Sequence, residues 1–541
     1  MIGRRTFLVG SAAVAGVTFT GTAHADQGGA GRLWQEFTET PYSHPQIPNV
    51  AHAGYRGGET PPRPAVAANV LRYGAAKDGS ADAADAINQA IEDVGRAGGG
   101  VVLMPAGTYR VDDVIRIGYD DVVLRGVGSG STILRPTRHL TDIVGEHRSQ
   151  HGGDSNAWCW TGGLVWVCHR DRYAELVDQI QRTTVAPERW TGDTVLSGIS
   201  EPAEQGDFAV RVADPAALSV GQRVLLRLDD NGDHSLLRHM CGEVEGTFTY
   251  PWGDMDRLLG SLPYTWPVRI AGIDGDVVEL AQPLPLDVRP EWEPAFTTTG
   301  PVVTGVGVEG ITIEMPEAEQ ATHLQDPGHN GVIFQCAWDC WGDDLVVRDG
   351  DNGFVFTCAK NVTLTRTVVS GRARHHSYIC REQSHDNVVD DFVIDEATTE
   401  LTDGAIHHGI NVEGLASGNV WSNGRMDNGT FDSHRGLPFG NVRTDIVVNN
   451  DGRHGGAAQQ GPLLGARFAH WNVTVTNGRA GCVRIDEIAP RSATVGISEV
   501  SDFGQIPGPD FTGDLESRLE SYGTPGISPG NLYHAQRDHL R

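Results

Sequence analysis

The stretch His329-Asn330-Gly331-Val332-Ile333-Phe334 places two polar residues before a glycine and an apolar run, and the pattern returns five more times before residue 465. Successive Gly or Ser positions are 22, 24, 32, 27 and 25 residues apart. Units of this length, with a turn signal and a short apolar strand, are too short for strand–helix–strand units and typical of solenoid coils. The sequence therefore predicts an all-β solenoid, a right-handed parallel β-helix.

Stacking of such coils would bring the polar pairs into one column. Neighbouring strands lie about 4.7–4.9 Å apart, so equivalent residues of successive coils stand above one another on the outside. The predicted column consists of His329/Asn330, Asp351/Asn352, His375/His376, His407/His408, His434/Arg435 and Gln459/Gln460. Four histidine-bearing coils gather side chains that titrate near neutral pH, and the arginine adds a fixed positive charge. This column is the candidate active site.

A second register competes with the glycine register at the third coil. Cys336, Cys358 and Cys380 are spaced 22 and 22 residues apart, so a cysteine ladder fits the first three coils equally well. The two registers differ by two residues, which leaves each side chain on the same face. The column is expected in both cases, and the three cysteines are expected to be free, buried thiols.

The position of each residue within its coil selects the candidate site. Counted from Gly or Ser, positions one and three should point inward, and position four and the first member of each polar pair outward. His407, His434, Arg381 and Glu413 should therefore share one surface, with Asp432 at its edge. The predicted catalytic residues are His407, His408, His434, Arg435, Arg381, Glu413 and Asp432. The predicted substrate-binding residues are His375, His376, His329 and Asp351.

Two chemistries fit these side chains. In β-elimination from a uronic acid polymer, a histidine can remove the proton beside the carboxylate while Arg435 or Arg381 binds that carboxylate bidentately. In glycoside hydrolysis two carboxylates flank the bond, and Glu413 and Asp432 are the candidates. Histidine and arginine outnumber acids in the column, so the sequence favours a polysaccharide lyase, with a glycoside hydrolase as the alternative.

The column also allows non-catalytic interpretations. Polar residues at coil turns form ladders that satisfy backbone groups, and Asn330, Asn352 and Gln460 fit that role. Such a ladder does not need imidazoles, which favours function for the histidine-rich coils. A carbohydrate-binding or surface β-helix is the third hypothesis. Adjacent histidines also suggest a transition metal, but no carboxylate or thiolate stands at matched spacing.

The net charge and the N-terminal segment indicate which partners and which cellular location to expect. The chain has 541 residues and a formal charge of −28, which argues against binding of nucleic acid or an anionic membrane surface, whereas a local basic cleft could still bind an anionic polysaccharide. Residues 1–25 contain Arg4-Arg5, an apolar run and Ala23-His24-Ala25, which predict a twin-arginine signal and secretion. No other apolar stretch approaches the roughly 20 residues of a membrane span. The oligomeric state stays open.

Residues 69–135 carry the most specific motif of the chain. A Tyr-Gly-Ala-Ala-Lys-Asp-Gly turn at 73–79 leads into a helical pattern, followed by Gly98-Gly99-Gly100, a buried strand and a Pro-Ala-Gly-Thr-Tyr turn at 105–109. The apolar face of the helical pattern consists of Ile87, Ala90, Ile91 and Val94. This order resembles the opening of the pectate-lyase superfamily, in particular its rhamnogalacturonase/epimerase-like members.

The resemblance implies a fold more than a chemistry. It implies that the helix caps the first coil and removes an exposed sheet edge. The superfamily includes lyases, hydrolases, epimerases and phage tailspikes, so the fold does not select among them. Its lyases often use Ca²⁺, and the acids of Asp339–Asp351 are the candidate ligands through coil stacking, although no standard oxygen-rich loop is present.

The remaining segments complete the predicted domain organisation. Residues 26–68 form an N-terminal extension, 69–139 the start of the β-helix with its capping helix, 140–300 a β-rich insertion, 301–505 the main coils, and 506–541 a C-terminal cap or tail with a short helix at 514–522. The insertion should contain a hairpin around Asp274-Gly275. The tryptophans of residues 140–300 either stack on sugars or fill the core of the insertion.

Overall fold

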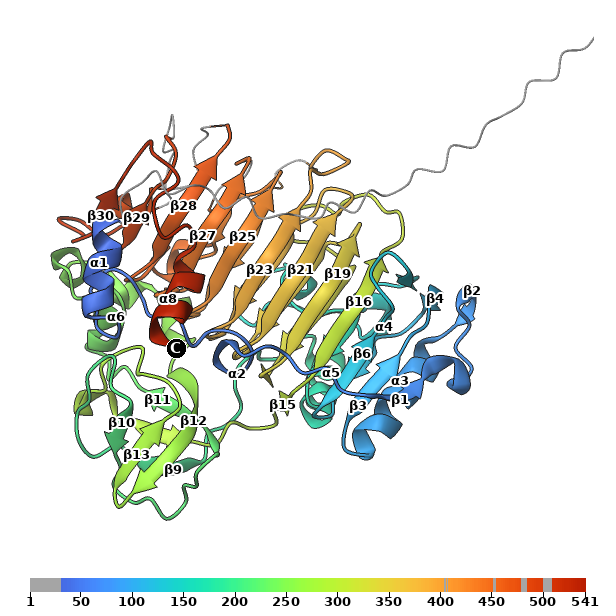
Figure 1. Cartoon of the computed structure of the whole chain (residues 1–541), viewed down its shortest axis with the longest axis horizontal. Helices are drawn as coiled ribbons and strands as arrows, with labels where there is room; N and C mark the ends of the chain where they lie inside the picture. Colours follow the sequence, from blue (N-terminus) through green and yellow to red (C-terminus); the bar gives the residue numbers. More distant parts are fainter. Residues whose placement is uncertain (1–30, 403–404, 406, 451–453, 478–483, 500–507) are drawn as a thin grey trace, which may run out of the picture.

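The computed structural model describes residues 31–402, 405, 407–450, 454–477, 484–499 and 508–541. Parallel strands stacked side by side form a long β-helix (Figure 1), so the predicted all-β, right-handed parallel β-helix is confirmed. The predicted signal at residues 1–25 lies outside the described residues. None of the described helices is both long and apolar enough to cross a membrane.

The longest sheet follows the whole β-helix from one end to the other. Its strands in spatial order are β1 (Val66–Asn69), β3 (Gly100–Leu103), β6 (Val122–Arg125), β16 (Gly307–Glu314), β19 (Trp341–Arg348), β21 (Thr363–Ser370), β23 (Val388–Ile394), β25 (Val420–Met426), β27 (Val442–Val448), β28 (Ala469–Val475), β29 (Ala493–Val495) and β30 (Arg518–Glu520). At its first end it also includes β2 (Asp78–Asp82), β4 (Gly107–Val111) and β7 (Thr132–Pro136). Apolar residues at every second position, such as Leu345 and Val347, are buried in the core.

A second parallel sheet, which we call the site sheet, carries the repeated motif. Its strands are β5 (Ile115–Ile117), β8 (Val165–Val167), β17 (Asn330–Gln335), β20 (Asn352–Thr357), β22 (His376–Arg381), β24 (Ile410–Val412) and β26 (Phe431–Ser433). Gln335, Thr357 and Arg381 stand level in adjacent strands. The glycine register is therefore the one that forms, and Cys380 lies opposite Phe356 rather than in a cysteine ladder.

The last two copies of the motif do not begin strands of the site sheet. In the fifth coil the strand is β26, and Asp432 lies opposite Asn411 of β24. The sixth copy falls in the 3₁₀ turn η6 (Ala458–Gln460). Pro438 and Pro462 explain the difference, because proline has no N–H to donate to a neighbouring strand. As a result His434 follows Ser433 as Glu413 follows Val412, so the two side chains occupy equivalent positions.

The helices lie mostly at the ends and margins of the β-helix (Figure 1). They are α1 (Arg32–Glu39), α2 (Tyr55–Gly58), α3 (Ala84–Arg96), α4 (Leu140–Ile143), α5 (Arg170–Thr183), α6 (Ser235–Met240), α7 (Asp256–Leu259) and α8 (Leu532–Leu540). Helix α3 forms where predicted and packs its apolar face on the first strands of both parallel sheets. The helix predicted at 514–522 is wrong, because β30 occupies that segment and pairs with β29.

The insertion is smaller than predicted. Its antiparallel sheet consists of β9 (Val195–Gly198), β10 (Ala209–Arg211), β11 (Arg223–Leu228), β12 (Tyr264–Asp274), β13 (Val277–Leu280) and β14 (Ala295–Thr297). The predicted hairpin joins β12 to β13, whereas β8, inside the predicted range 140–300, belongs to the site sheet. Six tryptophans of this range are buried and fill cores: Trp158, Trp166, Trp190, Trp252, Trp266 and Trp292.

The other predictions about buried groups can be compared directly. The seven described cysteines are buried and free, which confirms the prediction for Cys336, Cys358 and Cys380, while Cys482 lies outside the described residues. Asn352 donates to Oδ1 of Asn330 over 3.0 Å, so the expected amide ladder is present in these two coils.

A longer amide ladder predicts a measurable loss of stability. In the buried ladder of Asn387, Asn419 and Asn441, each of the first two side chains donates to Oδ1 of the next. We expect Asn419→Ala to lower the free energy of unfolding by about 1–3 kcal/mol for each buried group left unsatisfied. Denaturant unfolding measures this loss, with Asn231→Ala at an exposed turn as the control; equal effects of the two substitutions would contradict the prediction.

Candidate active site

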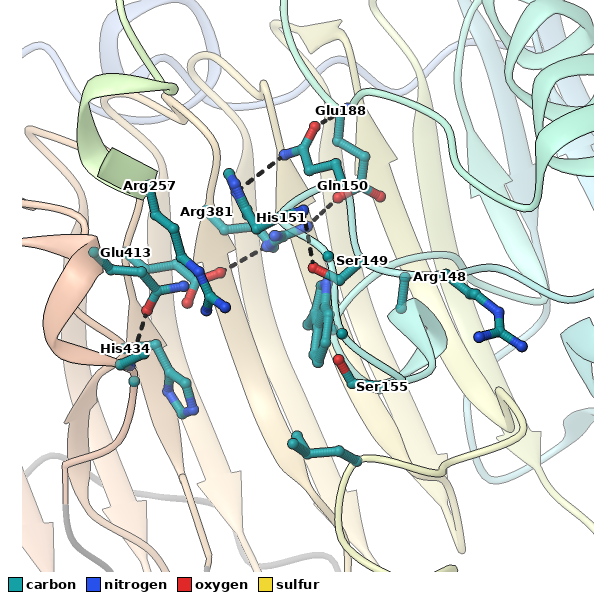
Figure 2. A pocket seen from close by; sticks show the side chains of 18 of the residues that line it. Arg148, Ser149, Gln150, His151, Ser155, Glu188, Arg257, Arg381, Glu413 and His434 are labelled. Carbon is teal, nitrogen blue, oxygen red and sulfur yellow. Dashed lines mark hydrogen bonds and ion pairs between the residues drawn. The ribbon is translucent and has the colours of Figure 1, made fainter. Parts of the chain in front are cut away.

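A cavity of about 630 Å³ opens at the carboxyl ends of three strands of the site sheet, β22, β24 and β26 (Figure 2). These ends supply Arg381, Glu413 and His434. The rest of the wall comes from the loop at residues 147–157, from α7 in the insertion, and from segments 323–325 and 456–460. Parts of the chain far apart in sequence therefore meet at the candidate column.

Three of the predicted outward-facing residues do share one surface. Arg381, Glu413 and His434 line the cavity, and His376 lines it as well. The position-four rule placed Arg381 and Glu413 side by side, and the register of β26 adds His434 as the next member of that row.

Arg381 is the centre of a buried ion network. Its guanidinium pairs with Glu188, with Oε1 of Glu382 at 2.9 Å and with Oε1 of Glu413 at 2.7 Å. Burial lowers the pKa of Arg381, but the three carboxylates raise it further, so the net pKa lies above its usual range. Burial raises the pKa of Glu382 to about 7, against the lowering effect of Arg381. The guanidinium already binds three carboxylates, so the predicted role of substrate clamp would require Arg381 to give up existing ion pairs.

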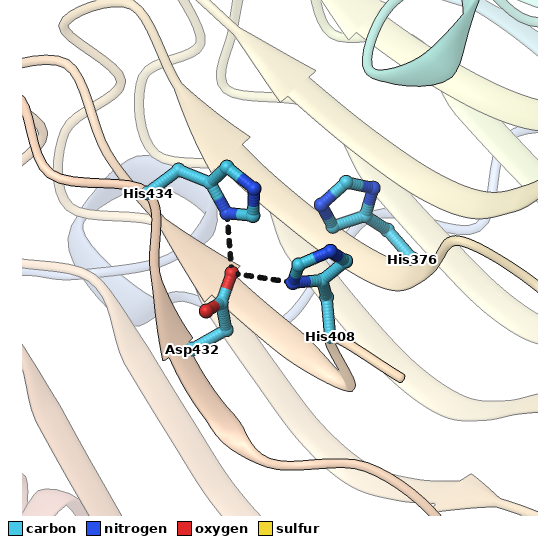
Figure 3. A group of neighbouring side chains, drawn as sticks. All are labelled: His376, His408, Asp432 and His434. Carbon is cyan, nitrogen blue, oxygen red and sulfur yellow. Dashed lines mark hydrogen bonds and ion pairs between the residues drawn. The ribbon is translucent and has the colours of Figure 1, made fainter. Parts of the chain in front are cut away.

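Behind the cavity, a buried carboxylate holds two imidazoles (Figure 3). Oδ2 of Asp432 lies 2.5 Å from Nδ1 of His434 and 3.0 Å from Nδ1 of His408. Asp432 is fully buried, and the side chain of His434 keeps 20% of its surface exposed, on the side of the cavity. Burial lowers the pKa of His434, but the charge and hydrogen bond of Asp432 outweigh burial and raise it. Burial lowers the pKa of His408 to about 3, although Asp432 opposes that shift.

Four imidazoles form a row beside the cavity, in which the first two contacts are stacked and the third, between His408 and His434, is edge-on. Ring centroids are 4.4 Å apart between His375 and His376, between His376 and His408, and between His408 and His434. Nδ1 of His375 lies 2.6 Å from Oδ2 of Asp326. Of these four rings, His376 and His434 line the cavity, whereas His375 and His408 do not.

Sequence reasoning missed the cavity residues that lie outside the coils. His151 belongs to the loop between α4 and β8, Arg257 to α7, and Trp160 is a half-buried ring of the wall. The guanidinium of Arg257 makes no ion pair or hydrogen bond within the described part of the chain. Burial lowers the pKa of His151, and the positive charges of Arg381 and Arg257 lower it further. The two histidines His147 and His151 stand close together in the sequence and could have suggested a site, but they lie outside the coil repeats that defined the column.

Besides His408 and Asp432, five predicted site residues do not line this cavity. Arg435 is fully buried and donates to the carbonyls of Gly461 and Gly508. Asp351 is buried in an ion pair of 2.5 Å with Arg372 and accepts the backbone N–H of His329. Buried residues of this set cannot touch a polymer, so the predicted clamp and binding roles are not available to them. The residues concerned are Arg435, Asp351, His329, His375 and His407.

Three of the acids predicted to bind calcium form ion pairs with arginines instead. Asp339 pairs with Arg223, Asp343 pairs with Arg366, and Asp351 pairs with Arg372. Within the described residues, two groups have ligand atoms close enough to share a metal ion, and neither includes these acids. One group consists of His376, His408, Asp432 and His434, and the other of Cys159, Asp326 and His375.

Comparison with known proteins agrees with this fold. Residues 67–182 match the family model described as rhamnogalacturonase A/epimerase, pectate lyase-like. This match supports a pectate lyase-like parallel β-helix, in agreement with the observed sheets.

Curated relatives match over a short segment. The mannuronan C5-epimerase AlgE3 of Azotobacter vinelandii is 35% identical over 118 residues, which cover 20% of this chain and 6% of the epimerase. Alginate lyase 7 of the same organism is 40% identical over 73 residues, 12% of this chain and 8% of the lyase. The match thus spans less than a tenth of either relative, and both relatives are polysaccharide-modifying enzymes by name.

Solved structures align over more of the chain. The tailspike protein gp49 of Pseudomonas phage LKA1 is 13% identical, with 80% of this chain and 62% of the tailspike covered and a TM-score of 0.47. The A-module of the mannuronan C-5 epimerase AlgE6 of Azotobacter vinelandii is 12% identical, with 84% and 85% covered and a TM-score of 0.37.

Proposed function

We propose that the protein is a secreted polysaccharide lyase that cleaves a uronic-acid-containing polymer by β-elimination in this cavity. The observation that carries the proposal is that one cavity is lined by both His151, whose imidazole is neutral, and Arg257, whose guanidinium has no ion pair within the described residues. The names of the two curated relatives support it, because C5 epimerisation and β-elimination of a uronate both begin with removal of the proton on C5.

Arg257 supplies the group that binds the substrate carboxylate. Its planar guanidinium can form two parallel hydrogen bonds to a carboxylate. Because it has no partner within the described residues, binding a substrate would not break an existing ion pair. Neutralising the carboxylate lowers the energy of the carbanion that forms when the C5 proton leaves.

His151 supplies the base. Burial and two neighbouring guanidiniums disfavour the charged imidazole, so the ring is neutral near pH 7 and has a lone pair to accept the C5 proton. Electrons of the broken C5–H bond then form the C4–C5 double bond as the glycosidic oxygen on C4 leaves. A residue or water must protonate that oxygen, and His434, held by Asp432 at the floor of the cavity, offers positive charge beside it.

The same geometry disfavours the hydrolase hypothesis. Hydrolysis needs two carboxyl groups that flank the scissile bond. Asp432 is fully buried behind His434 and does not line the cavity, and Glu413 is paired with Arg381. The predicted pair of carboxylates is therefore not open to a sugar.

Ultraviolet absorbance of the unsaturated product tests the reaction class. Incubation with a panel of uronic acid polymers should raise the absorbance, and reducing ends should appear at the same rate. New reducing ends without unsaturated product would replace the lyase by a hydrolase. No product from any uronate polymer would leave a carbohydrate-binding protein as the better hypothesis.

The pH dependence of the rate tests the role of His151. Charged groups facing it are Arg381, Arg257, Glu413 and Glu188. A base must be neutral, so activity should persist at neutral pH and fall as the pH drops through a pKa below the usual 6.5 of histidine. Arg257→Ala removes a positive charge that lowers this pKa, and should move the acidic limb of kcat/KM to higher pH while raising KM. An unmoved limb would contradict the assignment.

A further inference from the structure

We propose that His376, His408, Asp432 and His434 bind one divalent transition-metal ion of the zinc type. One ligand atom from each residue lies within 4.8 Å of the corresponding atoms of the others (Figure 3). Tetrahedral zinc with bonds of about 2.0–2.1 Å holds its ligand atoms about 3.3 Å apart, so small side-chain rotations would bring the four into place.

Unsatisfied hydrogen-bonding groups support this site. A neutral imidazole carries an N–H on one nitrogen and a lone pair on the other. Both ring nitrogens of His376 and Nε2 of His408 are buried without a hydrogen-bond partner. Such groups cost about 1–3 kcal/mol each when buried. A metal ion would use the lone pairs and compensate the cost of gathering these rings.

The donor set selects the class of ion. Calcium and magnesium prefer oxygen ligands, whereas imidazole suits zinc, copper, iron and nickel. Three imidazoles and one carboxylate therefore favour a transition metal over the calcium ion that the family resemblance implies. The carboxylate leaves a divalent ion with a net positive charge in a buried site.

The backbone at Gly455 fixes the position of the cluster's carboxylate and packs against two of its rings. The backbone N–H of Gly455 donates to Oδ1 of Asp432 over 3.1 Å, which fixes the carboxylate. A Cβ on Gly455 would lie 2.7 Å from Cε1 and Nε2 of His434 and 3.3 Å from Cε1 of His408, so only glycine lets the chain pass this close to the rings.

One side of the site faces the substrate cavity. His376 and His434 line the cavity, while His408 and Asp432 lie behind them. An ion held by these four would lie at the wall of the cavity, and a ligand from the cavity could bind it only as a fifth ligand. It would place positive charge where a hydrogen bond now joins His434 to Asp432, next to the carboxylate or leaving oxygen of a uronate. This catalytic use rests on the proposed lyase function, but the binding of the ion does not.

Metal binding can be measured on the full chain without a histidine tag. After removal of metal with a chelator, equilibrium dialysis against Zn²⁺ should give one ion per chain, and Co²⁺ should give the visible absorption of a nitrogen-ligated ion. His376→Gln, His408→Gln and His434→Gln should each weaken binding by at least about 100-fold. His534→Gln, on α8 and bonded to Asp390, removes a distant imidazole and should leave binding unchanged.

Two results would overturn the proposal. One is the absence of saturable one-to-one binding of Zn²⁺ or Co²⁺ by the folded protein. The other is wild-type affinity in His434→Gln, the variant least disruptive to folding because this ring is partly exposed. The binding assay contains no polysaccharide: binding without unsaturated product would reject the lyase and keep the metal site, and product without binding would do the reverse.

Discussion

Replacing His151 by glutamine should lower kcat of the lyase reaction by about 10²–10⁴-fold, the usual contribution of a general base. Glutamine keeps a polar side chain in the cavity but has no basic nitrogen, so the C5 proton loses its acceptor. Substrate binding should change little, because Arg257 still binds the carboxylate. The initial rate of unsaturated product formation, measured over a range of polymer concentrations, separates the effect on kcat from that on KM.

A matched substitution controls for the loss of any imidazole. His534→Gln changes a histidine on α8 that lies outside the cavity and should leave kcat and KM as in the wild type. Far-UV circular dichroism of both variants should equal that of the wild type. If His151→Gln keeps more than about a tenth of the wild-type kcat, His151 is not the general base and another residue must accept the C5 proton.

The fold could be predicted because it depends on local, repeated patterns. A glycine or serine followed by alternating apolar residues defines each coil, and the triple glycine with its helix marks the first turn. The prediction failed where proline interrupts the repeat. Pro438 and Pro462 were visible in the sequence, but their effect on the register of β26 depends on which neighbouring strand would need the missing N–H.

The site could be predicted only in part, because a large part of the cavity wall comes from segments outside the coils. The column correctly brought Arg381, Glu413 and His434 to one surface. His151 and Arg257 come from a loop and from the insertion, and no periodicity relates them to the column. The role of Arg381 depends on Glu188, which is 193 residues away in the chain and reaches it only through folding.

Substitution of Arg381 and substitution of Arg257 should have opposite effects on stability and on KM, although both arginines line the cavity. Arg381→Met removes the partner of three largely buried carboxylates, Glu188, Glu382 and Glu413. Breaking a buried ion pair in this way costs about 3–5 kcal/mol, because the remaining charge stays desolvated. Arg257→Met breaks no ion pair and should change stability by less than about 0.5 kcal/mol while raising KM. Thermal unfolding midpoints and KM values of the two variants give the comparison.

The loss of stability in Arg381→Met should depend on pH, and the direction of that dependence identifies the physical cause of the loss. Without the guanidinium, which now lowers the pKa of Glu382, the folded-state pKa of Glu382 should rise further above the unfolded value of about 4.3. A raised folded-state pKa lowers stability as pH rises, since the folded state then binds more protons than the unfolded state. The difference from wild type should therefore grow as the pH rises above about 7, where Glu382 of the wild type loses its proton and Glu382 of the variant keeps it. Adding Glu413→Gln to Arg381→Met removes one unpaired charge and should recover part of the loss. A pH-independent loss that this second substitution does not reduce would mean that Arg381 stabilises the cavity by packing alone.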